Sequence, residues 1–515
     1  MTDDEVGALL RSPNPLVVVD APAGCGKTYQ GASYAKDAAS GLNSGQVLIL
    51  THTHAARTVF AERTRDISHR VEIRTIDGFL TELASAYHRV LGLPQDVAIW
   101  ARDTHNGFDV VAEKCSGFLA GAKTVASALS ARYPVIICDE HQDASEAQHS
   151  AIMALKSTGS SLRIFGDPMQ LIFASGANDG NGSKERAIQK GLARWEALRT
   201  DGVPGELETP HRWATGSPDL GRWVLHARTA LKRGDAIDLT GPPPSGLTIH
   251  FAENVARSDH NAYMLEKDKR KPIDNHIKSK QQILMLSNGN DRVDHINSLL
   301  YRRFSIWEGH TRSFLSDLVK CIRESRGQAI SICEGLLIFI ESIAVGFTRS
   351  LHGKVFIEEV ANACAKPRKG SRAHLQAMAR HLLDAPDHKG VSRVLSHLVD
   401  LVQRAEKGFD EIKLDLKHEL HDAIRLGSFN CPDEGFAEIS RRRTFTHPKP
   451  PLKCLSTIHK SKGLECENAM IIPCDRAAFT NTQYKRHLLY VGLSRAKSSL
   501  FLVLSKRTPS PLFKI

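Results

Sequence analysis

The sequence predicts an α/β protein with two parallel sheets, the second of which is interrupted by a helical segment. Three observations support this prediction. Short hydrophobic strands alternate with helix-compatible segments between Val17 and Gln170. A glycine-rich turn joins the first of these strands to the helix that follows it. Strand-like runs return after residue 450, beyond a long stretch of helical periodicity.

The composition is that of a soluble globular protein. The chain has 515 residues, enough for about three or four core-forming units of ~150 residues each. Hydrophobic residues make up 41% of the chain and charged residues 24%. The 68 Lys and Arg residues exceed the 57 Asp and Glu residues, which gives a formal charge of +11 and a pI near 9.1. This excess suits a polyanionic partner but is spread over a large protein.

The cysteine pattern predicts reduced thiols and a cytoplasmic location. None of the ten cysteines belongs to a Cys-x-x-Cys pair. The opening residues MTDDEVGALL are acidic and do not predict a signal peptide. The most apolar segment, Ala329 to Phe347, contains Glu334 and Glu341. It therefore predicts a core helix, because a membrane span needs about 20 largely uncharged residues.

The turn after the first strand predicts a binding site for a nucleoside triphosphate. The segment from Val17 to Gln30 reads VVVDAPAGCGKTYQ, which is a buried strand, a tight loop and a helix start. Glycines at two loop positions allow backbone N–H groups to turn toward phosphate oxygens. We expect contacts with the nucleotide from nine consecutive residues: Ala21, Pro22, Ala23, Gly24, Cys25, Gly26, Lys27, Thr28 and Tyr29.

Two of these residues have expected roles of their own. Lys27 would reach the β- and γ-phosphates, and the Thr28 hydroxyl would bind a magnesium ion. A chance glycine-rich turn is the alternative. The strand before the loop and the helix-compatible TYQGASYAKDAA after it favour the phosphate site.

The elements that follow continue the first sheet. Strands are predicted at Gln46–Leu50 and Val71–Thr75, and within Tyr133–Asp143 and Ser161–Gln170. Residues 80–132 are mostly helical in character, as in an insertion between strands. The polar, turn-forming segment 176–184 predicts a mobile loop.

The second sheet is predicted to begin after GPPPSG at 241–246, which marks a connection between domains. Its strands are expected at Ile283–Leu286, from Leu452, at Met470–Ile472 and at Leu500–Ser505. The helical part between them has an apolar stripe at Val391, Val394, Leu395, Leu398 and Val402. The predicted division is a first sheet domain at 1–79 and 133–240 with the insertion 80–132, and a second at 247–304 and 450–515 with the insertion 305–449.

Acidic residues at the end of one strand are the expected catalytic groups. The run VIICDEHQD places Asp139 and Glu140 at a carboxyl end, where ligands bind in open α/β sheets. Asp139 would hold magnesium, and Glu140 would activate water for attack on the γ-phosphate. The alternative is an acidic turn. Gln170 ends the next strand and is placed to sense the γ-phosphate.

Two arginines are candidates for stabilising the transition state. Arg212 in LETPHRW and Arg495 in YVGLSRAK lie beside short hydrophobic runs in different halves of the chain. An arginine of this kind supplies about 10³–10⁵ in the rate of phosphoryl transfer. A solvated surface role is the alternative for each of them.

These motifs occur in an order that resembles the UvrD/Rep type of superfamily 1 DNA helicases. APAGCGKT, LTHTHAARTVFAER, RTIDGF, DEHQD and FGDPMQLIF resemble motifs I, Ia, Ib, II and III. LETPHRW resembles motif IV, and ILMLSNGNDRVDHINSLL resembles the opening of the second motor domain. STIHKSKGLE and LLYVGLSRAKSSLFL resemble motifs V and VI and are the most specific. The resemblance covers about a quarter of the residues, in both halves of the chain.

The resemblance implies two RecA-like motor domains of the P-loop NTPase class, with ATP and Mg²⁺ in the cleft between them. The first domain would contribute Lys27, Thr28, Asp139, Glu140, Gln170 and Arg212. From the second, Glu465 would accept a hydrogen bond from the ribose, and Arg495 would reach the γ-phosphate when the cleft closes. Cleft closure and opening would move the protein 3′ to 5′ along one DNA strand.

Contacts with single-stranded DNA are implied at six positions, where polar groups hold the backbone and aromatic rings stack on bases: Thr51, His52, Thr75, Phe173, Thr457 and His459. A structural cap or turn is the alternative for the polar members of this set. The basic runs Lys366–Arg372 and Arg441–Arg443 are candidates for phosphate contacts, with a solvated face as the alternative.

Several positions differ from the family pattern. No glutamine that would read adenine precedes the phosphate loop, and His211 stands where a tyrosine stacks on the base. His52 and Cys466 each stand where the family pattern has an aromatic residue. Ala174-Ser175 stands where the family pattern has a Trp-Arg pair. Cys25 lies near a helix N-terminus, which lowers a thiol pKa, so a redox switch is an alternative to a small loop-filling residue.

The expected function is an ATP-dependent DNA translocase or helicase, acting in DNA repair or anti-phage defence. One alternative is a DNA-sensing regulatory ATPase subunit of a nuclease or repair complex, which unwinds little itself. A P-loop phosphotransferase is a further alternative. No nuclease motif or membrane partner is predicted in the chain.

Overall fold

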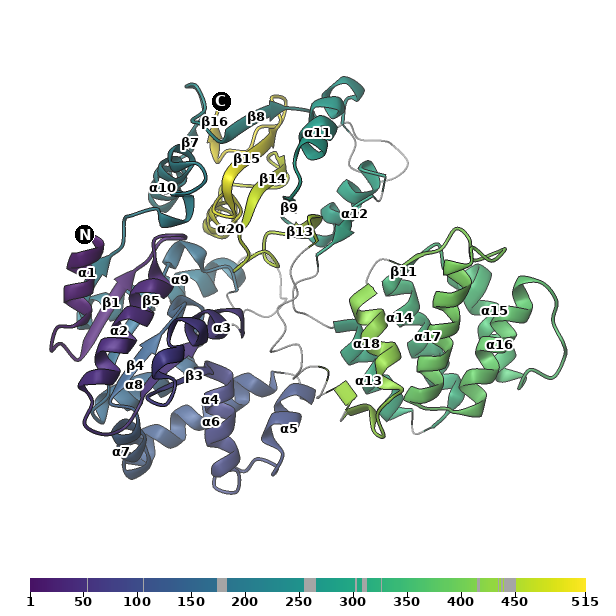
Figure 1. Cartoon of the computed structure of the whole chain (residues 1–515), viewed down its shortest axis with the longest axis horizontal. Coiled ribbons are helices and arrows are strands. Elements are labelled where there is room, and N and C mark those ends of the chain that lie inside the picture. The colour runs from purple at the N-terminus through teal and green to yellow at the C-terminus, as the bar shows by residue number, and fades with distance from the viewer. Residues whose placement is uncertain are drawn as a thin grey trace. The chain divides into compact units, whose positions relative to one another are not determined.

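The computed structural model describes residues 1–52, 54–104, 106–173, 183–253, 265–301, 303–307, 313–325, 327–414, 417–433, 435–436, 439 and 451–515. The chain forms two units (Figure 1). One combines Met1–Tyr301 with Leu452–Ile515, and the other is Arg302–Pro451. Most of the predicted loop 176–184 and all of Arg441–Arg443 lie outside the described residues.

The first sheet has six parallel strands in the order β3-β2-β4-β5-β1-β6. Its strands are β1 (Leu16–Asp20), β2 (Val47–Thr51), β3 (Val71–Thr75), β4 (Val135–Cys138), β5 (Ser161–Gly166) and β6 (Val203–Glu206). Every residue of β1, β2 and β4 is buried, as their continuous hydrophobic runs predict for strands covered on both faces. Because the strands are parallel, the loops that follow them gather at one edge.

Among the described residues, nine α-helices pack with the first sheet and its covering helices: α1 (Asp3–Leu10), α2 (Lys27–Gly41), α3 (His54–Arg63), α4 (Ile76–Ala86), α5 (Val97–Asp103), α6 (Gly107–Gly121), α7 (Lys123–Arg132), α8 (Glu146–Ser157) and α9 (Ser183–Asp201). The next helix, α10 (Pro218–Arg233), packs mainly against α20 (Gln483–Leu493) and β15 (Ala496–Leu504). Residues of α4, α5 and α6 share one hydrophobic cluster with the strand residues Leu48, Ile136 and Ile164. The helical segment 80–132 thus packs as part of this sheet's own core.

The second sheet contains the parallel run β13-β9-β14-β15-β8. These strands are β8 (Leu247–Phe251), β9 (Ile283–Ser287), β13 (Lys453–Thr457), β14 (Cys466–Cys474) and β15 (Ala496–Leu504). The helices are α11 (Lys267–Ser279), α12 (Asn290–Leu299) and α20 (Gln483–Leu493). A separate pair joins β7 (Ile237–Asp238) to β16 (Phe513–Lys514). The predicted fold class, an α/β P-loop NTPase with two motor domains, is confirmed.

The unit Arg302–Pro451 is helical and is drawn in green in Figure 1. It contains β10 (Ser305–Ile306), α13 (Ser313–Glu324), α14 (Ala329–Ile343), β11 (Ala344–Val345), the π-helical turn Arg349–Gly353, α15 (Lys354–Ala361), α16 (Ser371–Asp384), α17 (His388–Gln403), β12 (Lys413–Leu414) and α18 (Lys417–Leu426). Its buried cluster is drawn from residues 315–439, so it has a hydrophobic core of its own. The predicted stripe on α17 belongs to that core, although Val402 is partly exposed.

Within the described part of the chain, no helix is both long and apolar enough to cross a bilayer. The predicted core helix Ala329–Phe347 corresponds mainly to α14, whose apolar residues are buried inside the helical unit.

The elements that were not predicted from the sequence include α1, β6 and β8. Helix α1 begins with a capping box. The Thr2 side chain accepts from the Glu5 backbone N–H, and the Glu5 side chain accepts from the Thr2 backbone N–H. The edge strand β6 reads VPGE, and proline and glycine are poor strand formers. The edge strand β8 has five residues after a proline-rich turn.

Candidate active site

The phosphate loop has the backbone that its sequence predicts. It follows the buried strand β1 and ends at Gly26, the N-cap of α2. Gly24 and Gly26 have φ angles of +77° and +83°, which residues with a Cβ adopt rarely. A Cβ on Gly24 would also lie 2.6 Å from the Arg212 Cβ. No side chain caps α2, so its first N–H groups are available to an anion.

Lys27 lies against the two acidic residues that follow β4. Its Nζ is 3.4 Å from Asp139 Oδ1 and forms an ion pair with Glu140. Burial opposes the charge on Lys27, but the two carboxylates outweigh it and raise the pKa of the amine. Burial also opposes the charge on Glu140, yet Lys27 and Lys462 hold the pKa of Glu140 well below its usual range. The site therefore keeps Lys27 and Glu140 ionised.

Asp139 has the properties of a magnesium ligand. Its side chain is almost fully buried, and burial raises the pKa of its carboxyl. Its Oδ1 atom is buried, and the Lys27 amine at 3.4 Å is its partner in an ion pair. A buried carboxylate oxygen of this kind fits a hard cation, which is bound through oxygen ligands and the phosphates of a nucleotide. Thr28, in the first turn of α2, offers the second predicted oxygen.

Glu140 is held in an uncommon backbone conformation. Its φ angle is +53°, in the left-handed region that non-glycine residues seldom occupy. Gln142 donates a hydrogen bond of 2.5 Å to Glu140 Oε2 and accepts one of 3.1 Å from the Asp167 backbone N–H. This link fixes the carboxylate relative to the next strand. Such strain, about 1–3 kcal/mol, is typical of functional sites.

Asp167, after β5, joins several parts of the site. Its carboxylate accepts hydrogen bonds from Arg228 (3.0 and 3.2 Å), the Met169 backbone (3.2 Å) and Gln170 Nε2 (3.0 Å). The Tyr490 hydroxyl, from α20 of the second sheet, donates to it at 2.9 Å. The same hydroxyl accepts from the Ala23 backbone N–H at 2.9 Å. A residue of the second sheet domain thus contacts the phosphate loop directly.

Arg212 and Glu465 form another connection between the two sheets. Arg212 donates to Glu465 Oε1 at 2.7 Å and to the Ser494 carbonyl at 2.6 Å. Glu465 also forms an ion pair of 3.3 Å with Lys497. Burial raises the pKa of Glu465, but Arg212 and Lys497 more than offset this and lower it. The ribose contact predicted for Glu465 would compete with these cations.

Arg495 is fully buried beside this pair. Its guanidinium donates to the carbonyls of Val491 (2.8 Å) and Leu464 (3.1 Å) and to the Ser494 hydroxyl (2.7 Å). Burial, reinforced by the neighbouring Arg212, lowers the pKa of Arg495 to about 10. A buried guanidinium held by neutral acceptors is a cation for which a phosphate would be a strong partner.

Lys462 of the second sheet domain also reaches the first. Its Nζ donates to Asp143 Oδ2 at 2.5 Å and to the Gln170 carbonyl at 2.7 Å. Lys27, Glu140 and Gln170 therefore lie on one side of the site, and Lys462, Glu465 and Arg495 on the other.

The residues expected near the base have other partners here. His211, about half exposed, contacts Asp3 of α1 at 2.5 Å, and its Cδ2 atom lies 3.1 Å from the position of a Cβ on Gly26. Tyr29 is 61% exposed, with the Arg63 guanidinium 5.7 Å from its ring centroid.

The expectation that the helix N-terminus lowers the Cys25 pKa is wrong. The thiol is buried, and burial raises its pKa to about 12. The structure agrees with the alternative of a small residue that fills the loop.

Three of the predicted DNA contacts are buried or used within the fold. Thr51 is fully buried at the end of β2, and Thr75 caps α4 by accepting from the Gly78 backbone N–H at 3.0 Å. His52 Nε2 is buried without a hydrogen-bond partner, and burial lowers the pKa of its ring to about 4. The cap or turn alternative therefore has direct support at Thr75.

The other three predicted DNA contacts differ in exposure, and Thr457 is buried. Phe173 is 52% exposed, and Lys462 Nζ is 5.1 Å from its ring centroid. Thr457 accepts from the Lys460 backbone at 3.3 Å. His459 hydrogen-bonds the Tyr484 hydroxyl, with the two rings stacked 5.8 Å apart.

Sequence reasoning assigned no role to Gln142, Asp167, Lys462 or Tyr490, although each lies within a quoted motif. Trp213 was also missed; it is fully buried and donates to the Ala496 carbonyl at 2.7 Å. The motif spacing was the available signal, but the partners are hundreds of residues apart in sequence.

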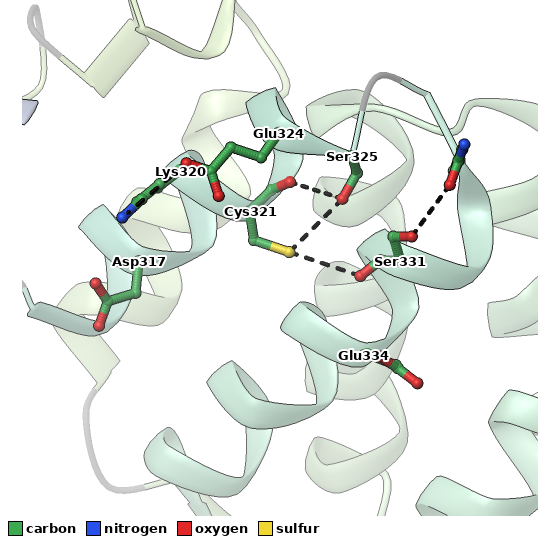
Figure 2. A pocket seen from close by; sticks show the side chains of 8 residues that line it. Asp317, Lys320, Cys321, Glu324, Ser325, Ser331 and Glu334 are labelled. Atoms are coloured by element: carbon green, nitrogen blue, oxygen red, sulfur yellow. Dashed lines mark hydrogen bonds and ion pairs between the residues drawn. The ribbon is translucent and has the colours of Figure 1, made fainter.

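A cavity of about 510 Å³ lies in the helical unit, between α13 and α14 (Figure 2). It is lined by Asp317, Lys320, Cys321, Glu324, Ser325, Gln328, Ser331 and Glu334. The Cys321 thiol donates to the Ser331 carbonyl at 3.6 Å, and Ser325 donates to the Cys321 carbonyl at 2.7 Å. Its lining groups bond mainly to each other, and none belongs to the nucleotide site.

Comparisons with known families match both sides of this site. Residues 7–176 match the model of an AAA domain, and residues 453–503 match that of the UvrD-like helicase C-terminal domain. A comparison with curated proteins gave no match. The first match contains the phosphate loop, Asp139 and Glu140, and the second contains Glu465 and Arg495. The two matched domains, which face one another across one phosphate loop, support the assignment of this chain to the UvrD/Rep-like helicases of superfamily 1.

Proposed function

We propose that the protein is an ATP-dependent DNA translocase and helicase that moves 3′ to 5′ on single-stranded DNA. The observation that carries this proposal is the Tyr490 hydroxyl, which bonds both the phosphate loop and Asp167. A motor needs a nucleotide that is touched from two bodies, so that hydrolysis changes the contact between them. DNA repair and anti-phage defence are the settings that we expect.

The domain division that we propose for this motor is the one stated from the sequence. Residues 1–79 and 133–240 form the first motor domain, with 80–132 as its insertion. Residues 247–304 and 450–515 form the second, with 305–449 as its insertion.

The charges of the site suggest how nucleotide binding prepares catalysis. Lys27 is paired with Glu140 and Asp139. The β- and γ-phosphates would compete for the Lys27 amine, which releases the Glu140 carboxylate to accept a proton from the attacking water. Thr28 and Asp139 would hold Mg²⁺, which neutralises charge on the phosphates.

Arg212 and Arg495 would supply the remaining positive charge. Both bond to Ser494, Arg212 through the carbonyl and Arg495 through the hydroxyl. A shift of α20 toward the phosphates would therefore carry both guanidinium groups with it. The Gln170 amide donates a hydrogen bond to Asp167. A contact between Gln170 and the γ-phosphate would therefore also change the hydrogen bonds of Asp167.

A regulatory ATPase subunit that senses DNA for a nuclease or repair partner is the second candidate. The surroundings of Thr51, Thr75 and His52 favour it. Thr51 and the His52 Nε2 atom are buried, and Thr75 caps α4. Such a protein would hydrolyse ATP on DNA but would separate strands poorly.

The decisive experiment measures ATP turnover with and without single-stranded DNA, and with and without magnesium, beside a strand-displacement assay on a 3′-tailed duplex. We expect DNA to stimulate turnover. Lys27→Ala and Glu140→Gln should each reduce it by at least about 100-fold. Glu196→Gln, on an exposed side chain of α9, is the matched control for the charge change.

The outcomes separate the candidates. DNA-stimulated turnover with strand displacement supports the motor, and stimulation without displacement supports the sensing subunit. DNA-independent turnover that passes phosphate to a small acceptor would support a phosphotransferase. Full stimulated activity in Glu140→Gln would contradict the role given to that carboxylate.

A further inference from the structure

A group of aromatic and basic side chains lies at the start of α20, outside the nucleotide site. It consists of Tyr484 and Lys485 in the first turn of α20 and Lys184 in the first turn of α9. The two amines lie 4.9 Å (Lys184) and 5.6 Å (Lys485) from the Tyr484 ring centroid. The ring also stacks against His459, a predicted DNA contact. We call these three residues the Tyr484 patch.

The positive charges of the patch have few acidic neighbours among the residues that the structure describes. Within the described residues, no carboxylate forms an ion pair with Lys184, Lys485 or the nearby Arg292. Glu185 contacts this turn only through the Tyr484 backbone N–H, at 3.0 Å. Burial, then Arg292 and Lys184, lower the pKa of Lys485 to about 8. The folded protein thus holds like charges together at a cost.

The position of Lys485 makes this arrangement still less favourable. It is the third residue of α20, where its backbone N–H donates to the Thr482 cap at 3.3 Å. The positive end of a helix dipole disfavours a cation there by about 0.3–1 kcal/mol. Stability alone would not select a lysine at this position, whereas an anionic ligand would be attracted by the lysine.

We propose that the Tyr484 patch binds single-stranded DNA, with a base stacked on the Tyr484 ring and the flanking phosphates held by Lys184 and Lys485. Lys184 is exposed, so its amine can move from the ring face to a phosphate when a base arrives. The proposal rests on the function proposed above and adds a contact to it. The patch continues toward Lys462 and Phe173 through His459, whose carbonyl accepts from the Lys462 backbone N–H at 3.2 Å.

The test uses fluorescence anisotropy of a labelled single-stranded oligonucleotide on the full-length protein. Tyr484→Leu should weaken binding by about 5- to 150-fold, the range for loss of one stacked base. Lys184→Gln combined with Lys485→Gln should weaken binding and reduce the salt slope by about 1.4, because single-strand contacts contribute ~0.7 each. Lys190→Gln, which changes an exposed lysine six residues along α9, should change neither value.

A second oligonucleotide, with abasic sites in place of its bases, separates the two parts of the patch. Tyr484→Leu should then have no effect, while the double lysine variant should still weaken binding. Thermal unfolding of each variant shows whether it is folded. Tyr484→Phe keeps the ring, so normal affinity in this variant beside weak binding in Tyr484→Leu supports stacking even if the leucine variant is less stable.

The results that overturn the proposal are distinct from those that overturn the function. If the wild-type protein binds single-stranded DNA but both patch variants bind like Lys190→Gln, the patch is not a DNA site. If the wild-type protein neither binds DNA nor is stimulated by it, the motor function fails and the patch proposal fails with it. Tighter binding to duplex DNA or to RNA than to single-stranded DNA would also refute the ligand assigned here.

Discussion

Tyr490→Phe is the substitution that tests the connection between the two sheet domains most directly. It removes one hydroxyl and keeps the ring, which is fully buried. Two bonds of 2.9 Å are lost, one from the Ala23 backbone N–H and one to Asp167 Oδ2. Asp167 keeps its bonds to Arg228, Met169 and Gln170, so the carboxylate remains satisfied.

The expected cost follows from what is left unpaired. The Ala23 N–H would be buried without an acceptor, which costs about 1–3 kcal/mol. The lost bond to Asp167 is charge-assisted, so its loss increases this cost. Phenylalanine has no hydroxyl to remove from water, which offsets part of the cost. We therefore expect a net loss of about 1–3 kcal/mol. If this loss weakens transition-state binding at the nucleotide site, kcat/KM for ATP decreases by about 5- to 150-fold.

The assay compares steady-state ATP turnover and thermal unfolding with those of Tyr133→Phe. Tyr133 is also buried, and its hydroxyl donates to Glu72 Oε2 at 2.7 Å, within the first sheet domain and away from the phosphate loop. Both variants should lower the melting temperature by a few degrees. Only Tyr490→Phe should lower kcat/KM.

One result would refute the reasoning. If Tyr490→Phe destabilises the protein as Tyr133→Phe does, yet keeps kcat/KM within twofold of wild type, then the hydroxyl is a packing group only. The proposed transmission between the domains would then have to pass through the Arg212 and Glu465 pair.

Three further predictions concern other groups. Glu465→Gln should raise the KM for ATP about 3- to 10-fold with a smaller change in kcat, because it removes a charge that would bind the ribose; an unchanged KM in steady-state assays would argue against that contact. Cys25 should resist thiol reagents in the folded protein, since burial raises its pKa to about 12, and rapid labelling found by mass spectrometry would contradict this. Affinity for single-stranded DNA should fall as pH rises through about 8, because Lys485 loses its charge there. Burial, together with Arg292 and Lys184, lowers the pKa of Lys485 to this value. Lys485→Gln should flatten the pH profile of DNA affinity between pH 7 and 9.

The parts of the structure that the sequence predicted are those with a local signature. The hydrophobic strands, the glycines of the phosphate loop and the acidic pair after β4 all form patterns within about ten residues. Their meeting at one edge follows from parallel strand order alone. Lys27 and Asp139 were expected to share this edge, and 3.4 Å separates their charged atoms.

The unpredicted parts depend on contacts between distant residues. Nothing near Tyr490 in the sequence indicates that its hydroxyl meets Ala23. Nothing near Gly24 indicates that Arg212 and Trp213 pack against it. Edge strands such as β6 are short and contain residues that are rare in strands. Local propensity predicts them poorly because pairing with a neighbour determines them.

The helical unit lies between two strands of the second sheet in the sequence, and this order affects how the chain folds during synthesis. β9 pairs with β13, with Ile283 opposite Lys453, and the whole helical unit is synthesised between them. Because synthesis proceeds at about 5–20 residues per second, β13 is made roughly 10 to 30 seconds after β9. All five of its residues are buried in the finished protein. We therefore expect the helical unit, which has its own core, to fold first, and an apolar strand to depend on chaperones until translation ends.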